Sequence, residues 1–240
     1  MRMRFTHSVL ASSLSLLMGG SMALANNDRA TEVKKRLSEA HHSLRNILTA
    51  GDKGIPRDLL DSAECAIVVP GLKKGGFVVA AQYGKGFMTC RTGENRSWSA
   101  PANIRIEGGS VGLQAGAGEV DMFLLVMNKS AIDKLLTSEF KIGGEAQVMA
   151  GPVGRSSRAD TDAFMHAKML AWSHSRGVFA GLALEGSTLR EDTDDNEALY
   201  GRRLDNKQII RGNVAIPDAA EPMLNLLRNP ATAPASSAQK

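Results

Sequence analysis

The chain has 240 residues, of which 22% are charged, and its 29 lysines and arginines exceed its 25 aspartates and glutamates to give a formal net charge of +4. An excess this small, with no run of aromatic side chains alternating with Arg or Lys, argues against a protein that binds nucleic acid. The length suffices for one substantial core. Because no linker divides the chain, we expect a single domain over residues 26–228.

Residues 1–25 have the composition of a secretory signal peptide. Arg2 and Arg4 form a charged start, residues 9–18 form a short apolar segment, and Ala23-Leu24-Ala25 is a cleavage motif. The apolar segment is shorter than the ~20 residues that span a bilayer, which favours cleavage over an uncleaved anchor. We therefore expect the mature chain to begin at Asn26 and to be exported, into the periplasm if the source is Gram-negative.

Residues 28–50 are predicted to form an amphipathic helix that ends at Gly51. Its apolar residues recur at alternating spacings of three and four: Ala30, Val33, Leu37, Ala40, Leu44, Ile47 and Leu48. Its basic residues lie on the other faces, among them Lys34, Lys35, Arg36 and Arg45. Such a helix either covers the core of its own domain or lies in a membrane interface. We expect Leu37 and Leu44 to be core residues and the basic side chains alone to meet anionic head groups.

The next segment predicts a short helix over 57–64, opened by Pro56, and three strands at 65–69, 77–83 and 87–91. Lys73-Lys74-Gly75-Gly76 is interpreted as the first turn and Gly84-Lys85-Gly86 as the second, a short hairpin loop. If both turns lie at one end of the sheet, Lys73, Lys74 and Lys85 would receive a phosphate there; otherwise they are simply solvated.

Cys65 and Cys90 fall on the first and third of these strands, and we predict that they lie close enough to pair. Export favours a disulfide, whereas two small buried thiols would fit the sequence equally well. Further along, many glycines lie inside apolar strand-like runs, where they mark bends, bulges or close backbone approach. The sequence therefore predicts an α+β fold, in which a glycine-rich curved antiparallel sheet or partial barrel carries packed helices.

No motif predicts catalysis, a metal or a cofactor. Residues 108–112 fit G-x-S-x-G, but the glycines that follow would not hold the helix that a nucleophile elbow needs. The acidic run at 191–197 lacks the glycine and glutamate of a calcium loop, and it instead predicts a helix to Tyr200 capped by Asp195 or Asn196. Residues 229–240 are rich in Pro, Ala and Ser and are predicted to be disordered.

An ordered set of segments runs through most of the chain. The set begins with Leu59-Leu60 and Ala63, the apolar run to Pro70, Lys74-Gly75-Gly76-Phe77 and Tyr83-Gly84-Lys85-Gly86. It continues with Trp98-Ser99-Ala100-Pro101, the glycine-rich residues 108–116, the apolar residues 123–127 and 131–136, and GLALEGSTL at 181–189. Over roughly residues 33–201, this set resembles the SYLF domain, a lipid-binding family.

The resemblance implies a non-catalytic lipid-binding protein. In eukaryotic SYLF proteins, an amphipathic N-terminal helix and nearby basic residues engage phosphoinositides, and the matching positions here are Lys34, Lys35 and Arg36. For an exported protein, the anionic phospholipid would be phosphatidylglycerol, cardiolipin or phosphatidic acid instead of a phosphoinositide. Some yeast relatives bind and bundle actin, so the alternative is an envelope protein partner bound through the glycine-rich sheet.

Overall fold

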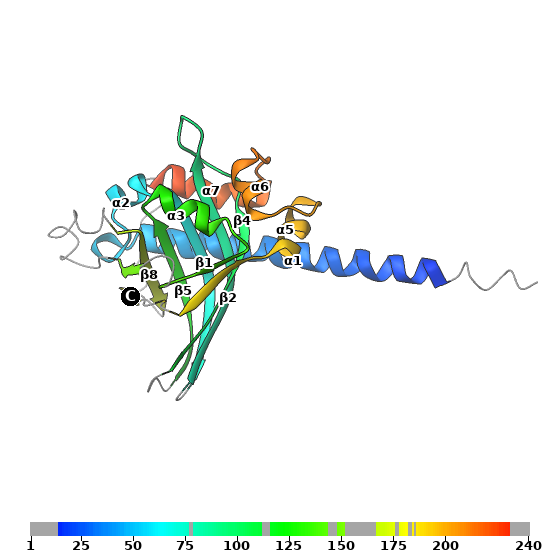
Figure 1. Ribbon diagram of the computed structural model, residues 1–240, viewed down its shortest axis with the longest axis horizontal. Helices are drawn as coiled ribbons and strands as arrows, with labels where there is room; N and C mark the ends of the chain where they lie inside the picture. The colour runs from blue at the N-terminus through cyan, green and yellow to red at the C-terminus, as the bar shows by residue number, and fades with distance from the viewer. Residues whose placement is uncertain are drawn as a thin grey trace, which may run out of the picture.

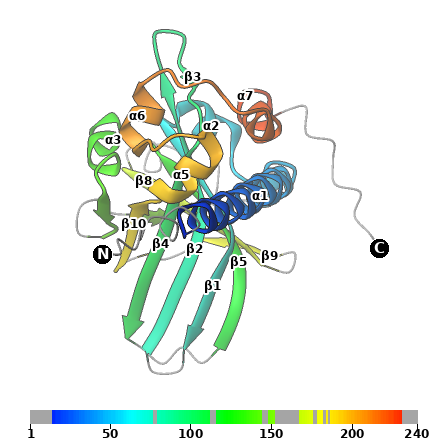
Figure 2. The same ribbon diagram turned by 90° about the vertical axis from the view of Figure 1, so that its right-hand side faces the viewer.

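The computed structural model describes residues 14–76, 79–111, 116–143, 148–151, 167–175, 178–181, 184 and 186–230. These residues form a strongly curled sheet with helices on both faces, as the α+β prediction expected (Figures 1 and 2). The helices are α1 (Leu14–Leu48), η1 (Gly51–Lys53), α2 (Arg57–Ser62), α3 (Lys129–Leu135), α5 (Thr193–Tyr200), α6 (Asn206–Arg211), η3 (Asp218–Ala220) and α7 (Glu221–Arg228). The strands are β1 (Cys65–Gly76), β2 (Val79–Thr92), β3 (Ser97–Trp98), β4 (Ala102–Val111), β5 (Gly116–Val126), β6 (Glu139–Lys141), β7 (Val148–Ala150), β8 (Met169–Ser175), β9 (Val178–Gly181) and β10 (Ser187–Glu191).

The described strands form one sheet in the order β6-β10-β4-β2-β1-β5-β8-β7, with β3 paired to β2 and β9 paired to β8. The pairs are antiparallel except β7 with β8, which are parallel. The sheet was predicted to be antiparallel, but it is mixed, because its β7–β8 end contains a parallel pair. The chain between β7 and β8 is long enough for the crossover that a parallel pair requires, whereas a short hairpin is not.

The two predicted turns in residues 65–91 are wrong, because β1 and β2 are long continuous strands. Residues 84–86 lie inside β2, opposite a bulge in β1. Val68 pairs with Phe87 and Lys73 pairs with Tyr83, so four residues of β1 face three of β2. A Cβ at Gly86 would lie 2.2 Å from the carbonyl oxygen of Val68. This glycine therefore permits close approach of the two strands rather than a turn.

The bulge decides which side chains of β1 face which side of the sheet. Before it, Val68 packs on one face and Val69 on the other. With the extra residue, Leu72 joins the face of Val69, and Lys73 is turned to the opposite face, the one that α1 covers. Gly71 has φ of +62°, a left-handed conformation that suits glycine at a bulge.

Helix α1 packs its apolar stripe on that face, together with α2 and α7, whereas α3 and α6 cover the other face. Leu37 is fully buried and Leu44 is 2% exposed, which confirms that these residues belong to the core. The described contacts of α1 with the rest of the fold extend from Arg29 to Leu48, whereas the helix itself begins inside the predicted signal peptide. None of the described helices combines the length and apolarity needed to cross a bilayer.

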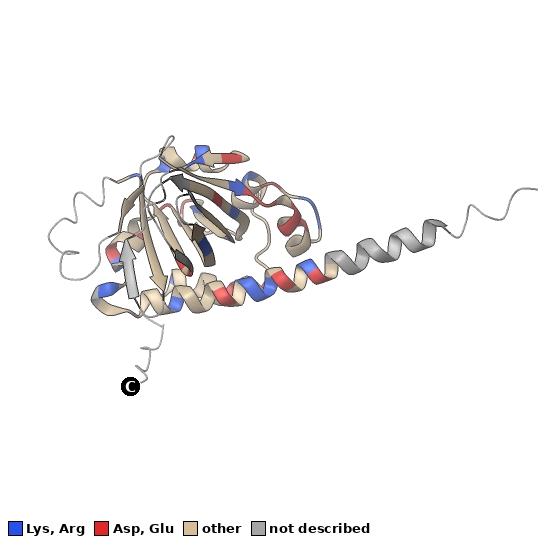
Figure 3. Cartoon of the chain, turned by 90° about the horizontal axis from the view of Figure 1, so that it is seen from below, with Lys and Arg blue, Asp and Glu red and all other residues tan. Residues whose placement is uncertain are grey.

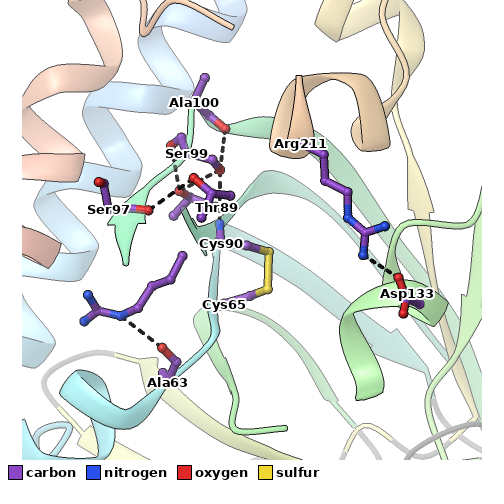
Figure 4. The surroundings of a disulfide bond; sticks show 11 residues. Ala63, Cys65, Thr89, Cys90, Ser97, Ser99, Ala100, Asp133 and Arg211 are labelled. Atoms are coloured by element: carbon purple, nitrogen blue, oxygen red, sulfur yellow. Dashed lines mark hydrogen bonds and ion pairs between the residues drawn. A yellow bond between two sulfur atoms is a disulfide. The ribbon is translucent and has the colours of Figure 1, made fainter. Parts of the chain in front are cut away.

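Cys65 and Cys90 face each other directly across β1 and β2 and are joined by a disulfide, with Cα atoms 3.9 Å apart (Figure 4). The predicted intervening strand is absent, since β2 follows β1 along the chain. Beside the disulfide, the backbone N–H of Cys90 donates to Ser99 Oγ, 3.1 Å away, and Thr89 Oγ1 donates to the carbonyl of Ser99. The bond thus closes the end of the hairpin at which β3 also attaches.

We expect replacement of both cysteines by alanine to lower the free energy of unfolding by about 3 kcal/mol, because the bond closes a 25-residue separation in the unfolded chain. Urea denaturation of the oxidised protein and of the Cys65→Ala/Cys90→Ala variant measures the difference. A reductant should destabilise the unsubstituted chain by a similar amount and leave the variant unchanged. Equal stability of the oxidised and reduced chains would contradict the prediction.

Candidate functional site

The acidic segment before Tyr200 anchors α5 against α1 and β2. Asp192, rather than Asp195 or Asn196, is the N-cap of α5, and its side chain accepts from the backbone N–H of Asp195. The predicted cap residues lie in the first turn instead. Asn196 is fully buried: its Oδ1 accepts from the backbone N–H of Asn103, and its Nδ2 donates to the carbonyl of Leu204. These bonds fix α5 beside β4.

The carboxylate of Asp195 lies between two cations that sequence analysis assigned to lipid contact. Its Oδ2 is 2.7 Å from Arg36 Nη1 and 3.0 Å from Lys85 Nζ, and its side chain is 2% exposed. Lys85 Nζ also lies 2.7 Å from Asp192. Burial lowers the pKa of Lys85, but the hydrogen bonds and charges of Asp192 and Asp195 outweigh it and hold that pKa above its ordinary value. Arg36 and Lys85 are thus held by internal ion pairs.

Next to these ion pairs, an open cleft of about 630 Å³ lies between α1 and strands β1, β2, β5 and β8; we call it the α1 cleft. Basic and acidic residues alternate along the described part of α1 beside the sheet (Figure 3). The cleft is lined by Arg36, Glu39, His42, Ser43, Pro70, Gly71, Lys73, Tyr83, Gly84, Lys85, Glu119, Val120, Asp121, His174 and Ser175. Its walls therefore carry both signs of charge.

The structure brings together three of the seven predicted basic residues, namely Arg36, Lys73 and Lys85. Lys34 and Lys35 are exposed on α1, but consecutive residues of a helix point about 100° apart, so they do not form one patch with Arg36.

The two remaining basic residues lie outside the cleft. Lys74 follows Lys73 in β1 and so points to the opposite face; burial lowers its pKa. Arg45 lies within hydrogen-bonding distance of the rings of His41 and His42, at 2.8 and 3.1 Å.

Sequence reasoning missed the residues that lie opposite Lys73 on the neighbouring strands. Lys73 pairs in register with Tyr83 on one side and with Glu119 on the other. Tyr83 is 46% exposed, a high value for a large apolar side chain. Asp121 accepts from the backbone N–H of Gly71 at 3.0 Å and lies 3.7 Å from His174 Nδ1. Only the register of the bulged strand could have placed these residues beside Lys73.

Gly108, Gly109 and Ser110 of the G-x-S-x-G match lie in β4, and β5 is the next described element, so no described helix follows the serine as a nucleophile elbow requires. Across the described ranges, His, Cys, Asp and Glu form no group of three or more suited to a metal ion. Most of the predicted tail, residues 231–240, lies outside the described residues.

Residues 107–230 match the family described as "Ysc84: Las17-binding protein actin regulator". The chain is 32% identical to Protein YSC84 of Saccharomyces cerevisiae over 214 residues, 85% of this chain and 45% of that protein. It is 33% identical to SH3 domain-containing protein PJ696.02 of Schizosaccharomyces pombe over 73% of this chain and 41% of that protein. With SH3 domain-containing YSC84-like protein 1 of Rattus norvegicus, the identity is 29% over 85% of this chain and 61% of that protein.

In each of these pairs the chain spans less than two thirds of its relative. The matched region nevertheless covers half of this chain or more, and it includes the end of β4, all of β5 and α5, and the acidic residues that hold Arg36 and Lys85. The chain therefore belongs to the Ysc84 family, the family of the SYLF domain.

Proposed function

We propose that the chain is a non-catalytic lipid-binding protein, exported to the cell envelope, that associates peripherally with anionic phospholipid surfaces. The observation that carries the proposal is the set of exposed cations formed by Lys34 and Lys35 on α1 and Lys73 at the cleft of about 630 Å³. Because the apolar stripe of α1 is buried in the core, contact with the membrane comes from exposed cations and from the cleft, not from insertion of the helix.

Exposed lysines on α1 and at the cleft are the residues to change. Lys34 and Lys35 are exposed on α1, and Lys73 is exposed at the cleft. Arg36 is excluded from the test because its ion pair with Asp195 is largely buried, so its loss would lower stability as well as any binding.

Replacing these three lysines by glutamate should weaken binding to phosphatidylglycerol vesicles more than tenfold. Each cation near the surface contributes ~1 kcal/mol, and ~1.4 kcal/mol corresponds to one decade. Sedimentation with vesicles of rising phosphatidylglycerol content, repeated in rising salt, measures the change. The thermal midpoint should move little, since the substituted residues are exposed.

A matched control replaces Lys129, Lys134 and Lys207 by glutamate and so changes the net charge by the same amount. These lysines are exposed on α3 and α6, across the sheet from α1. This control should bind vesicles nearly as tightly as the unsubstituted chain. Failure of the unsubstituted chain to bind anionic vesicles at low salt would reject the lipid proposal.

A second candidate is the binding of a protein partner, because the matching family is described as Las17-binding and one relative is named LAS seventeen-binding protein 3. Among the described strands, β6 lies at one end of the open sheet and β7 and β9 lie at the other. Unpaired strand edges can add a strand from a partner. Sedimentation that shows no vesicle binding would favour this candidate over the first.

A further inference from the structure

The outer end of the α1 cleft holds a row of three side chains on neighbouring strands. Tyr83 of β2, Lys73 of β1 and Glu119 of β5 are partners in register, and all three line the cleft. Side chains directly opposite one another on the same face of a sheet lie within reach of a single small ligand. The bulge in β1 is what brings Lys73 into this row.

The charges in this row are not used internally. Within the described part of the chain, the side chains of Lys73 and Glu119 make no ion pair or hydrogen bond, and both residues are exposed; the backbone carbonyl of Glu119 accepts from Ser175 Oγ. Arg36 and Lys85, at the inner end of the cleft, are instead neutralised by Asp195. The outer end therefore offers one available ammonium group and one available carboxylate.

These two available charges favour a ligand that carries both signs of charge. Arg36 and Lys85 are paired with Asp192 and Asp195, so Lys73 and Glu119 decide which charges the outer end accepts. The carboxylate of Glu119 would repel a purely anionic group about as strongly as Lys73 attracts it. A ligand that carries a phosphate and an ammonium group satisfies both side chains. The volume of about 630 Å³ is in the usual range for a small-molecule site.

We propose that the outer end of the α1 cleft binds a phosphoethanolamine group, with its phosphate at Lys73 and its primary ammonium at Glu119 on the neighbouring strand. The inference rests on the proposed function and names the head group that the same cleft takes. A primary ammonium donates N–H bonds to the carboxylate, whereas the trimethylated ammonium of phosphatidylcholine has no N–H to donate. The group reaches the cleft either as phosphatidylethanolamine in a membrane or as a free glycerophosphoester.

Vesicles that contain a fixed fraction of phosphatidylglycerol, completed with either phosphatidylethanolamine or phosphatidylcholine, test the head group. We expect about tenfold tighter sedimentation with the phosphatidylethanolamine vesicles, the factor that ~1.4 kcal/mol supplies. Glu119→Gln keeps the shape of the side chain and should abolish this preference for phosphatidylethanolamine. Glu94→Gln, at an exposed turn between β2 and β3, is the matched control and should retain the preference.

The outcomes separate this inference from the proposed function. Equal binding of the two vesicle types by the unsubstituted chain would overturn the head-group assignment and leave anionic lipid binding standing. Failure to bind any phosphatidylglycerol vesicle would overturn the proposed function itself. If Glu119→Gln keeps the preference for phosphatidylethanolamine, the phosphoethanolamine group does not bind at Glu119, and the proposed site is wrong. Calorimetric titration with soluble glycerophosphoethanolamine distinguishes the sources: heat of binding supports a free ester as ligand, and vesicle preference without it supports the membrane lipid.

Discussion

Replacing Asp195 by alanine is expected to cost about 3–5 kcal/mol of stability, because it leaves the cation of Arg36 in a largely buried position without its partner. The side chain of Arg36 is 16% exposed, so water cannot replace the lost carboxylate fully. Lys85 keeps Asp192 as a second partner at 2.7 Å, and the loss is therefore concentrated on Arg36. Urea denaturation followed by circular dichroism measures the change.

Two further variants show whether the unpaired charge is the cause. Asp61→Ala breaks an ion pair with Arg57 in which both side chains are more than half exposed, and it should change stability by no more than about 0.5 kcal/mol. Adding Arg36→Met to Asp195→Leu removes both charges and should recover a large part of the loss. A double variant that is as unstable as Asp195→Ala would mean that the packing of α5, not the charge, is what was lost.

The double substitution Leu37→Ser and Leu44→Ser should lower stability by about 5 kcal/mol or more, since each change removes a buried leucine and leaves a cavity with a hydroxyl group. A loss of that size is comparable to the whole stability of many domains. We therefore expect the variant to be largely unfolded at room temperature, as measured by near-ultraviolet circular dichroism.

The single variant Leu44→Ala, with an expected loss of about 3 kcal/mol, keeps the effect measurable by urea denaturation. The exposed pair Lys34→Ser and Lys35→Ser lies on the same helix and should leave the unfolding midpoint nearly unchanged. A folded Leu37/Leu44 double variant that has lost vesicle binding would instead identify the apolar stripe as a membrane face.

Local periodicity was sufficient to predict the core face of α1. The recurrence of apolar residues follows the helical repeat, and burial follows the same repeat, so Leu37 and Leu44 could be assigned without knowledge of the rest of the chain. The curved sheet was predictable for a similar reason, since glycines inside apolar runs signal bends and close approach wherever the partner strands lie.

The turns and the partners of the cations could not be predicted in this way, because each depends on residues distant in sequence. Gly84 and Gly86 resemble a hairpin loop until the carbonyl of Val68, on another strand, is seen to occupy the space of a side chain at Gly86. Arg36 and Asp195 are 159 residues apart, so nothing near Arg36 in the sequence indicates that its charge is already satisfied. The composition of the cleft likewise depends on strand register.

The bulge in β1 also bears on how the length of this chain can vary. Val69 pairs with Met122 and Leu72 with Val120, so Pro70 and Gly71 together face the single residue Asp121. Loss of one of these two residues would restore regular pairing and keep every later side chain of β1 on its present face, whereas a one-residue deletion elsewhere in the strand would exchange the faces. Relatives that lack one residue between Val69 and Leu72 would therefore still present a side chain at the position of Lys73 to the cleft.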